Sequence, residues 1–271
     1  SMTALPFHKG RHPYEGIAFQ FSHHIIEKNG DVRHAGQFLS FEPGVYPNYE
    51  FVRQLKAQLE KDKGTIFRYH NHENTYLNLI FKQLDADQNP PADSKALKSF
   101  IREITNWNEE VSCKPQSKKG KRCMVDLYKL VLSYYYSPFA KGSNSIKKIL
   151  PAIIQESGYL KNKYSKPVYG RSKQIKSLNF DEHVWIDQAC SMDPYKTLPP
   201  LFSEYDAEQL DKCFVGFDEL ADGGAAMMAY NYLQFSHIPA DQRETLRDGL
   251  LRYCELDTMA MVMILEGWLN M

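Results

Sequence analysis

Two side chains near the C-terminus have a spacing that suits metal-assisted hydrolysis. Tyr253 and Asp257 are four residues apart in a segment that we expect to be helical, so the phenol and the carboxylate share one face. A carboxylate can bind a hard divalent metal ion, and a phenol one turn away can orient an attacking water. The pair is therefore a candidate catalytic site with Asp257 as a metal ligand, although the spacing alone is common in helices without a catalytic role.

A second group of polar side chains, His70, Asn71, His72 and Glu73, follows the short apolar stretch 65–69. If that stretch is a strand, these side chains lie at its carboxyl end, where α/β sheets place ligand sites. Glu73 can then bind a metal or begin the next helix. The alternating histidines do not make a zinc site, because no third and fourth ligand is evident. An ordinary hydrogen-bonded turn explains the same residues equally well.

A third group has the chemistry of a phosphate site. Ser145, Lys147 and Lys148 lie at the start of a predicted helix, and Lys141 precedes the same Gly-Ser-Asn-Ser turn. Backbone N–H groups and lysine charge together bind phosphate at such a helix start. A simple helix cap with solvated lysines fits these residues as well.

Charge is unevenly distributed along the chain, although the formal net charge is zero. The segment 114–176 holds fifteen Lys and Arg against two acids, a local balance of +13, whereas 201–271 is acidic. Such asymmetry indicates either a surface that faces a polyanion such as nucleic acid or a solvated lysine-rich face. The tyrosines at 134–136 offer a base a stacking surface, or form core with one exposed ring.

Composition and length exclude several classes of protein. With 271 residues, 43% hydrophobic and 13% aromatic, the chain can bury a sizeable core and is not generally disordered. It contains no apolar run of membrane-spanning length, and its five cysteines are scattered without a CxxC pair. We therefore expect a cytoplasmic protein with reduced thiols. Walker-type loops, dinucleotide-binding glycine patterns and nucleophile elbows are absent from the sequence.

The rest of the sequence must supply the elements that position these side chains. Apolar patterning predicts strands at 17–27, 32–41, 65–69 and 123–126, the first two joined by a tight Asn-Gly turn. Helical periodicity and capping residues predict helices from Pro47, through 77–84, from Asp93 or Ser94 to about 107, over 127–136, after Ser145, over 225–235, and from 239 to about 269 unless broken near Gly249.

The fold predicted from this order is α/β. We expect a single domain over residues 1–271, with a mixed sheet and helices packed against it. The hairpin 17–41 and the strand 65–69 should belong to that one sheet, with the last helix packed on it. Residues 114–122 are interpreted as a basic loop, and about 157–221 as an irregular insertion.

Several segments, taken in order, resemble one family. They are RHPYEGIAFQFSHHII at 11–26, TIFRYHNHENTYL at 65–77, VDLYKLVLSYYYSP at 125–138, GSNSIKKILPAI at 142–153, DGGAAMMAY at 222–230 and LLRYCELDTMAMVMILE at 250–266. The chain resembles the domain of unknown function 2779 family, a bacterial group similar to DnaQ-like 3′–5′ exonucleases. The resemblance implies a ribonuclease H-like fold with a mixed central sheet, two bound Mg²⁺ or Mn²⁺ ions, and DNA or RNA as substrate.

The resemblance also implies roles for individual residues. Relatives hold the metal pair with four acids: an Asp-x-Glu on the first central strand, an acid after a later strand, and the acid of a Tyr-x-x-x-Asp motif. Glu73 occupies the third position, and Tyr253 with Asp257 matches the last motif. Asp126 looks structural rather than ligating. No Asp-x-Glu occurs before residue 73, so we expect the chain to begin just downstream of its first catalytic strand or to be a degenerate paralogue.

Two functions remain as hypotheses from different classes. The first is a metal-dependent nuclease domain, incomplete and inactive in this chain, with Glu73 and Asp257 as metal ligands and Tyr253 orienting water. Its basic segment would contact the phosphates of single-stranded DNA or RNA. The second is a non-catalytic nucleic-acid-binding or scaffold module that retains the fold.

Overall fold

The structure is a computed structural model that describes residues 8, 10–111, 114–187, 192–198, 224–235 and 239–271. These residues form small sheets and longer helices. The strands are β1 (Gln20–Ile26), β2 (Val32–Leu39), β3 (Phe67–Arg68), β4 (Asn106–Val111), β5 (Lys114–Lys119) and β6 (Val125–Asp126). The α-helices are α1 (Asn48–Leu59), α2 (His72–Ala86), α3 (Ser94–Ile104), α4 (Leu127–Tyr134), α5 (Ile146–Glu156), α6 (Gly158–Tyr164), α8 (Gly224–Phe235) and α9 (Ala240–Leu269). Two 3₁₀ turns are η1 (Pro138–Ala140) and η2 (Pro194–Thr197). The predicted mixed α/β class is confirmed.

The predicted hairpin is present. β1 pairs antiparallel with β2, with Gln20 opposite Leu39 and Ile26 opposite Val32. Its turn depends on Gly30, whose φ of +87° lies in the left-handed region that glycine adopts without steric cost.

The prediction of one mixed sheet is wrong for the described residues, whose strands form three separate two-stranded sheets. β3 pairs in parallel with β6 through only Phe67 with Val125 and Arg68 with Asp126. Neither β3 nor β6 pairs with a strand of the β1–β2 hairpin. The ribonuclease H-like arrangement therefore stays a prediction.

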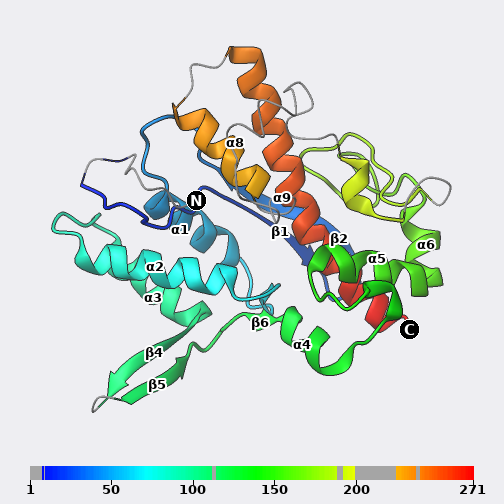
Figure 1. Ribbon diagram of the computed structural model, residues 1–271, viewed down its shortest axis with the longest axis horizontal. Coiled ribbons are helices and arrows are strands. Elements are labelled where there is room, and N and C mark those ends of the chain that lie inside the picture. The colour runs from blue at the N-terminus through cyan, green and yellow to red at the C-terminus, as the bar shows by residue number, and fades with distance from the viewer. Residues whose placement is uncertain (1–7, 9, 112–113, 188–191, 199–223, 236–238) are drawn as a thin grey trace.

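Helix α9 packs along the hairpin, as predicted, and lies across β1 in Figure 1. Its fully buried side chains include Leu256, Met259 and Met263. The predicted extent of this helix is confirmed, since it continues unbroken past Gly249 for 30 residues. Gly267 makes close packing possible, because a Cβ there would lie 2.4 Å from Cγ2 of Ile153 in α5.

A second core lies among α1, α2 and α3, on the other side of the molecule in Figure 1. In α3, Leu97, Phe100, Ile101 and Ile104 recur with helical spacing and are all buried. This core holds α2 in place and thereby positions the polar side chains at its N-terminus.

The interpretation of 114–122 as a basic loop is wrong over most of its length. Lys114–Lys119 is β5, which pairs antiparallel with β4. Gly120, directly after β5, packs against the last turn of α3, where a Cβ would lie 2.2 Å from the carbonyl oxygens of Arg102 and Glu103. Its strands are polar, so no alternation of apolar residues marks them in the sequence.

The segment predicted as an irregular insertion, 157–221, begins with helix α6 and continues as irregular chain to residue 187. This part is not peripheral, because Tyr164, Tyr169 and Trp185 are fully buried in the core beneath α5 and α9. Residues 188–191 and 199–221 lie outside the described part of the chain. Within the described residues, no helix is both long and apolar enough to cross a membrane.

Candidate metal and phosphate site

The site is built where two parallel strands end beside a long helix. β3 ends at Arg68 and is followed by α2, whose first turn contains Glu73. β6 ends at Asp126, and the α9 residue Asp257 comes from the other end of the sequence. Carboxyl ends of adjacent parallel strands face the same edge, which is why this fold gathers acids there.

Glu73 is exposed at the start of α2, but protein atoms around its carboxylate reduce the hydration of that group. The pKa of Glu73 is raised to about 7, mainly by this desolvation and to a smaller extent by the negative charges of Asp126 and Asp257, which the Arg68 charge opposes. Glu73 and Asp257 therefore lie within electrostatic reach of each other. The two carboxylates that we predicted as metal ligands thus lie in the same region of the molecule, and their role as ligands stays a prediction.

The face of α9 that carries Asp257 also carries Tyr253, as the four-residue spacing predicts. Asp257 Oδ1 accepts a hydrogen bond of 2.8 Å from the hydroxyl of Tyr195, a residue of η2. The rings of Tyr195 and Tyr253 lie 6.3 Å apart between centroids. Sequence reasoning missed Tyr195, because it lies in the irregular segment 157–221 and has no periodic context.

Of the four residues predicted to bind phosphate, Lys147 lies at this site. Its Nζ is 5.0 Å from the ring centroid of Tyr195 and 5.1 Å from that of Tyr253, close enough for cation–π attraction. The loop before α5 is held there by the Tyr69 hydroxyl, which donates to the carbonyl of Asn144 at 2.6 Å. A lysine charge therefore lies beside the two tyrosines that neighbour Asp257.

The other three predicted phosphate-binding residues surround the same loop. Ser145 is the N-cap residue of α5, but its side chain makes no capping hydrogen bond. Lys148 is exposed in the first turn of that helix. Lys141 is exposed after η1, with a left-handed φ of 53°. The three lie within six residues of Lys147 in the chain, and their contribution to the site stays a prediction.

Asp126 has a structural role, as expected. It forms an ion pair of 3.2 Å with Arg68, and both side chains are buried. Its Oδ1 also accepts from the backbone N–H groups of His70 and Tyr128, so it caps α4 and fixes the turn after β3. This turn presents Glu73 at the start of α2.

The residues present fit one weakly held metal ion better than a metal pair. Carboxylate oxygens are hard ligands, and Mg²⁺ is commonly held by one or two carboxylates together with water and a substrate phosphate. Glu73 and Asp257 have the carboxylate oxygens that such a site needs. Among the residues that the structure describes, no three His, Cys, Asp or Glu side chains are grouped so that they could hold a metal ion.

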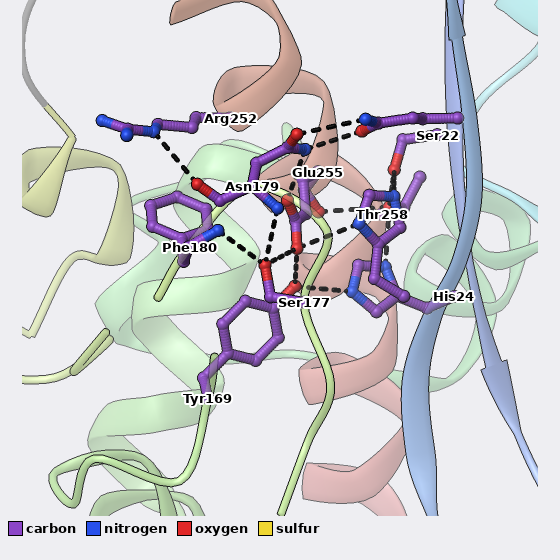
Figure 2. Close-up of polar contacts among 11 residues, drawn as sticks. Ser22, His24, Tyr169, Ser177, Asn179, Phe180, Arg252, Glu255 and Thr258 are labelled. Atoms are coloured by element: carbon purple, nitrogen blue, oxygen red, sulfur yellow. Dashed lines mark hydrogen bonds and ion pairs between the residues drawn. The ribbon is translucent and has the colours of Figure 1, made fainter. Parts of the chain in front are cut away.

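The opposite face of α9 carries a buried carboxylate that sequence reasoning missed. Figure 2 shows Glu255 enclosed by side chains from the hairpin and from the irregular segment. Its Oε1 accepts from the Tyr169 hydroxyl at 2.5 Å and from Ser177 at 2.6 Å, and its Oε2 accepts from Asn179 Nδ2 at 2.7 Å. Burial alone would raise the pKa of Glu255, but its contacts with His34, Ser177 and Tyr169 outweigh burial and lower it.

These contacts belong to a closed ring of polar side chains. In order around the ring, with neighbours 2.5 to 3.1 Å apart, they are Glu255, Tyr169, His24, Thr258, Ser22 and His34. Burial and the neighbouring His34 lower the pKa of His24 to about 3, so its imidazole is neutral. The Tyr169 hydroxyl donates its hydrogen bond to Glu255 and must accept one from His24. We therefore assign the His24 proton to Nε2, which donates to Tyr169.

Three members of the ring have the order of a serine hydrolase triad. Ser22 Oγ is 2.9 Å from His34 Nε2, and His34 Nδ1 is 3.0 Å from Glu255. All three residues are buried, however, and Ser22 also contacts Thr258 at 3.1 Å. We therefore interpret the ring as structural. It fixes the rotation of α9, and this rotation places Asp257 and Tyr253 on the face toward Glu73.

Comparisons with known proteins agree with part of the resemblance seen in the sequence. The sequence model of a family described as domain of unknown function (DUF2779) matches residues 1–145, which is more than half of the chain and includes Glu73, Asp126 and Lys141. Comparison with curated proteins and with solved structures gave no match. The similarity to DnaQ-like exonucleases therefore remains a prediction. The chain belongs to the DUF2779 family.

Proposed function

We propose that this chain is a nuclease-type domain in which Glu73 and Asp257 hold a divalent metal ion against a phosphate of nucleic acid. The observation that carries the proposal is that Tyr195 contacts both Asp257 and Lys147 beside Tyr253, and the charge of Asp257 also contributes to the raised pKa of Glu73. Lys147 and Tyr253, beside Asp257, supply a charge for phosphate and a phenol.

Each of these side chains has a role that follows from its surroundings. The Tyr195 hydroxyl orients Asp257 through its hydrogen bond. Glu73, with a pKa of about 7 in the metal-free chain, must lose its proton to bind a metal ion, so metal binding should strengthen as pH rises through neutrality. The Lys147 ammonium attracts a phosphate, and Tyr253 orients water. A bound Mg²⁺ or Mn²⁺ ion would act as a Lewis acid on a phosphoryl oxygen.

Cleavage by this chain is expected to be slow. The resemblance implies four acids around two metal ions, and the sequence matches two of them. The described residues likewise contain no three-ligand group. This second observation favours the alternative function, a nucleic-acid-binding module without catalysis, and metal binding separates the two.

The test measures Mn²⁺ affinity by electron paramagnetic resonance at pH 8, where Glu73 is ionised. Glu73→Gln and Asp257→Asn should each weaken binding by at least about tenfold. Asp248→Asn is the matched control, because it makes the same change at an exposed acid of α9 and should leave the affinity unchanged. If neither site variant alters Mn²⁺ affinity, the metal-binding proposal is wrong.

Cleavage is followed in the same preparations with a labelled single-stranded oligonucleotide and Mg²⁺. Slow cleavage lost in Asp257→Asn supports an enzyme. Oligonucleotide binding without any Mn²⁺ binding supports the non-catalytic module instead.

A further inference from the structure

Three aromatic side chains are exposed between the end of α4 and the start of α5. Tyr134 is 85% exposed, Tyr136 is 90% exposed and Phe139 is 52% exposed. Figure 1 shows this stretch at the edge of the molecule, where it leads from α4 around to α5. We call Tyr134, Tyr136 and Phe139 the aromatic surface. Apolar side chains exposed together on a surface mark interaction sites, whereas single ones need no explanation.

The backbone explains why two of the three consecutive tyrosines face solvent. Helix α4 ends at Tyr134, and Tyr135 is extended, with φ −124° and ψ 128°. Successive side chains of an extended chain point in opposite directions. Tyr135 points inward, where its hydroxyl donates to Glu156 at 2.8 Å and its ring packs beside Trp268. Tyr134 and Tyr136 therefore point outward.

The charges near the aromatic surface are positive. Lys129, Lys141 and Lys148 are exposed on the elements that flank it. Between residues 127 and 180 the sequence has one acid, Glu156, and its carboxylate accepts hydrogen bonds from Tyr135 and Ser137. Exposed rings among lysines match the chemistry of unpaired bases on a phosphate backbone.

We propose that Tyr134, Tyr136 and Phe139 are a stacking surface for the bases of single-stranded nucleic acid, which continues past Lys141 toward Lys147. The inference rests on the proposed function and deepens it by naming an unpaired strand as the substrate form. A duplex fits poorly, because its bases are already stacked on each other. The loop after Lys141 lies close to the chain that follows β3, because the Tyr69 hydroxyl donates to the carbonyl of Asn144. A bound strand that follows this loop would therefore approach the segment that carries Glu73.

The test compares two fluorescent 20-mers in EDTA at about 50 mM salt: an oligothymidylate and an abasic strand with the same number of phosphates. The wild-type chain should bind the oligothymidylate at least about fivefold more tightly, since each stacked base adds affinity. EDTA removes the metal ion, so this outcome does not depend on cleavage. Failure of the proposed metal site and failure of the stacking surface are thereby distinguishable.

Variants assign the preference to the rings. Tyr134→Ala with Tyr136→Ala should lower affinity for oligothymidylate about fivefold or more per ring and leave the abasic strand unaffected. Tyr134→Phe with Tyr136→Phe keeps the stacking faces and should retain wild-type affinity. Tyr14→Ala removes an exposed tyrosine outside this surface and should change neither affinity.

Three results would overturn the inference. The first is equal binding of the two strands by the wild-type chain, and the second is no binding of either strand. The third is a double alanine variant with unchanged oligothymidylate affinity. If that variant instead abolishes self-association seen by sedimentation, the aromatic surface serves a protein contact.

Discussion

Replacing Glu255 tests whether the buried ring holds α9 in place. Glu255→Leu has a similar volume but leaves the hydroxyls of Tyr169 and Ser177 and the amide of Asn179 without their acceptor. Unpaired buried donors cost about 1–3 kcal/mol each. Because some donors can find new partners, we expect a loss of about 3–5 kcal/mol in the free energy of unfolding.

Glu255→Gln is the milder change, because its amide oxygen can still accept from Tyr169 and Ser177. Its NH₂ group would meet the NH₂ group of Asn179, but Asn179 and Gln37 already exchange amide hydrogen bonds and can rotate together. Only the added strength of hydrogen bonds to a charged acceptor is then lost, which we put at about 1–3 kcal/mol. Glu244→Gln at an exposed position of α9 is the matched control and should stay within about 0.5 kcal/mol of wild type.

The pH dependence gives an independent check of sign. The folded-state pKa of Glu255 is lowered, so its ionised form stabilises the fold above the unfolded-state pKa of about 4.3. That contribution is lost as pH falls through the folded-state pKa. The difference between wild type and Glu255→Gln should therefore be full at pH 7 and smaller at the acid end of the range.

Urea denaturation followed by circular dichroism measures all three variants. The reasoning fails if Glu255→Leu costs less than about 1 kcal/mol, the low end of the cost of a single unpaired donor. It also fails if the Glu255→Gln difference is the same at pH 7 and at the acid end.

Two further predictions concern the candidate site and the core. In metal-free buffer, carboxyl NMR should find that Glu73 titrates near pH 7 and that Asp257→Asn lowers this pKa; an unchanged value would contradict their proximity. Because the folded-state pKa of Glu73 is raised, the folded chain holds a proton that the unfolded chain loses between about pH 4.3 and 7, so the free energy of unfolding falls over that range. Glu73→Gln should remove this pH dependence. Gly267→Ala would place a Cβ 2.4 Å from Ile153 Cγ2 and 3.0 Å from Leu160 Cδ1, so we expect a cost of about 1–3 kcal/mol and a lower Tm in a thermal melt. An unchanged melting temperature would mean that α5 and α6 yield freely.

Several local features were predictable because adjacent residues determine them. The alternating residues and the Asn-Gly turn specify the hairpin, and the helical spacing of Leu97 and Ile101 specifies the buried face of α3. The four-residue spacing of Tyr253 and Asp257 places both on one helical face. The β4–β5 hairpin was missed because its polar strands give no periodic signal.

The burial of Glu255 could have been predicted from its position in the sequence. It lies about half a turn from Asp257, on the face of α9 that buries Leu251 and Met259. An acid on an apolar face must find buried donors. The partners themselves could not be predicted, because Tyr169 and Ser177 come from irregular chain about 80 residues away.

The sequence by itself determined which residues have reactive chemistry and which local elements carry them, since both depend on residue type and on spacing within one or two turns. Only the tertiary structure decided which of them meet. Lys147 contacts the Tyr253 ring, whereas the neighbouring Lys148 is exposed. The described strands form separate sheets. These outcomes depend on packing between segments more than 100 residues apart, where the burial of α9 outweighs any local preference. The same packing brings the charge of Asp257 within reach of Glu73.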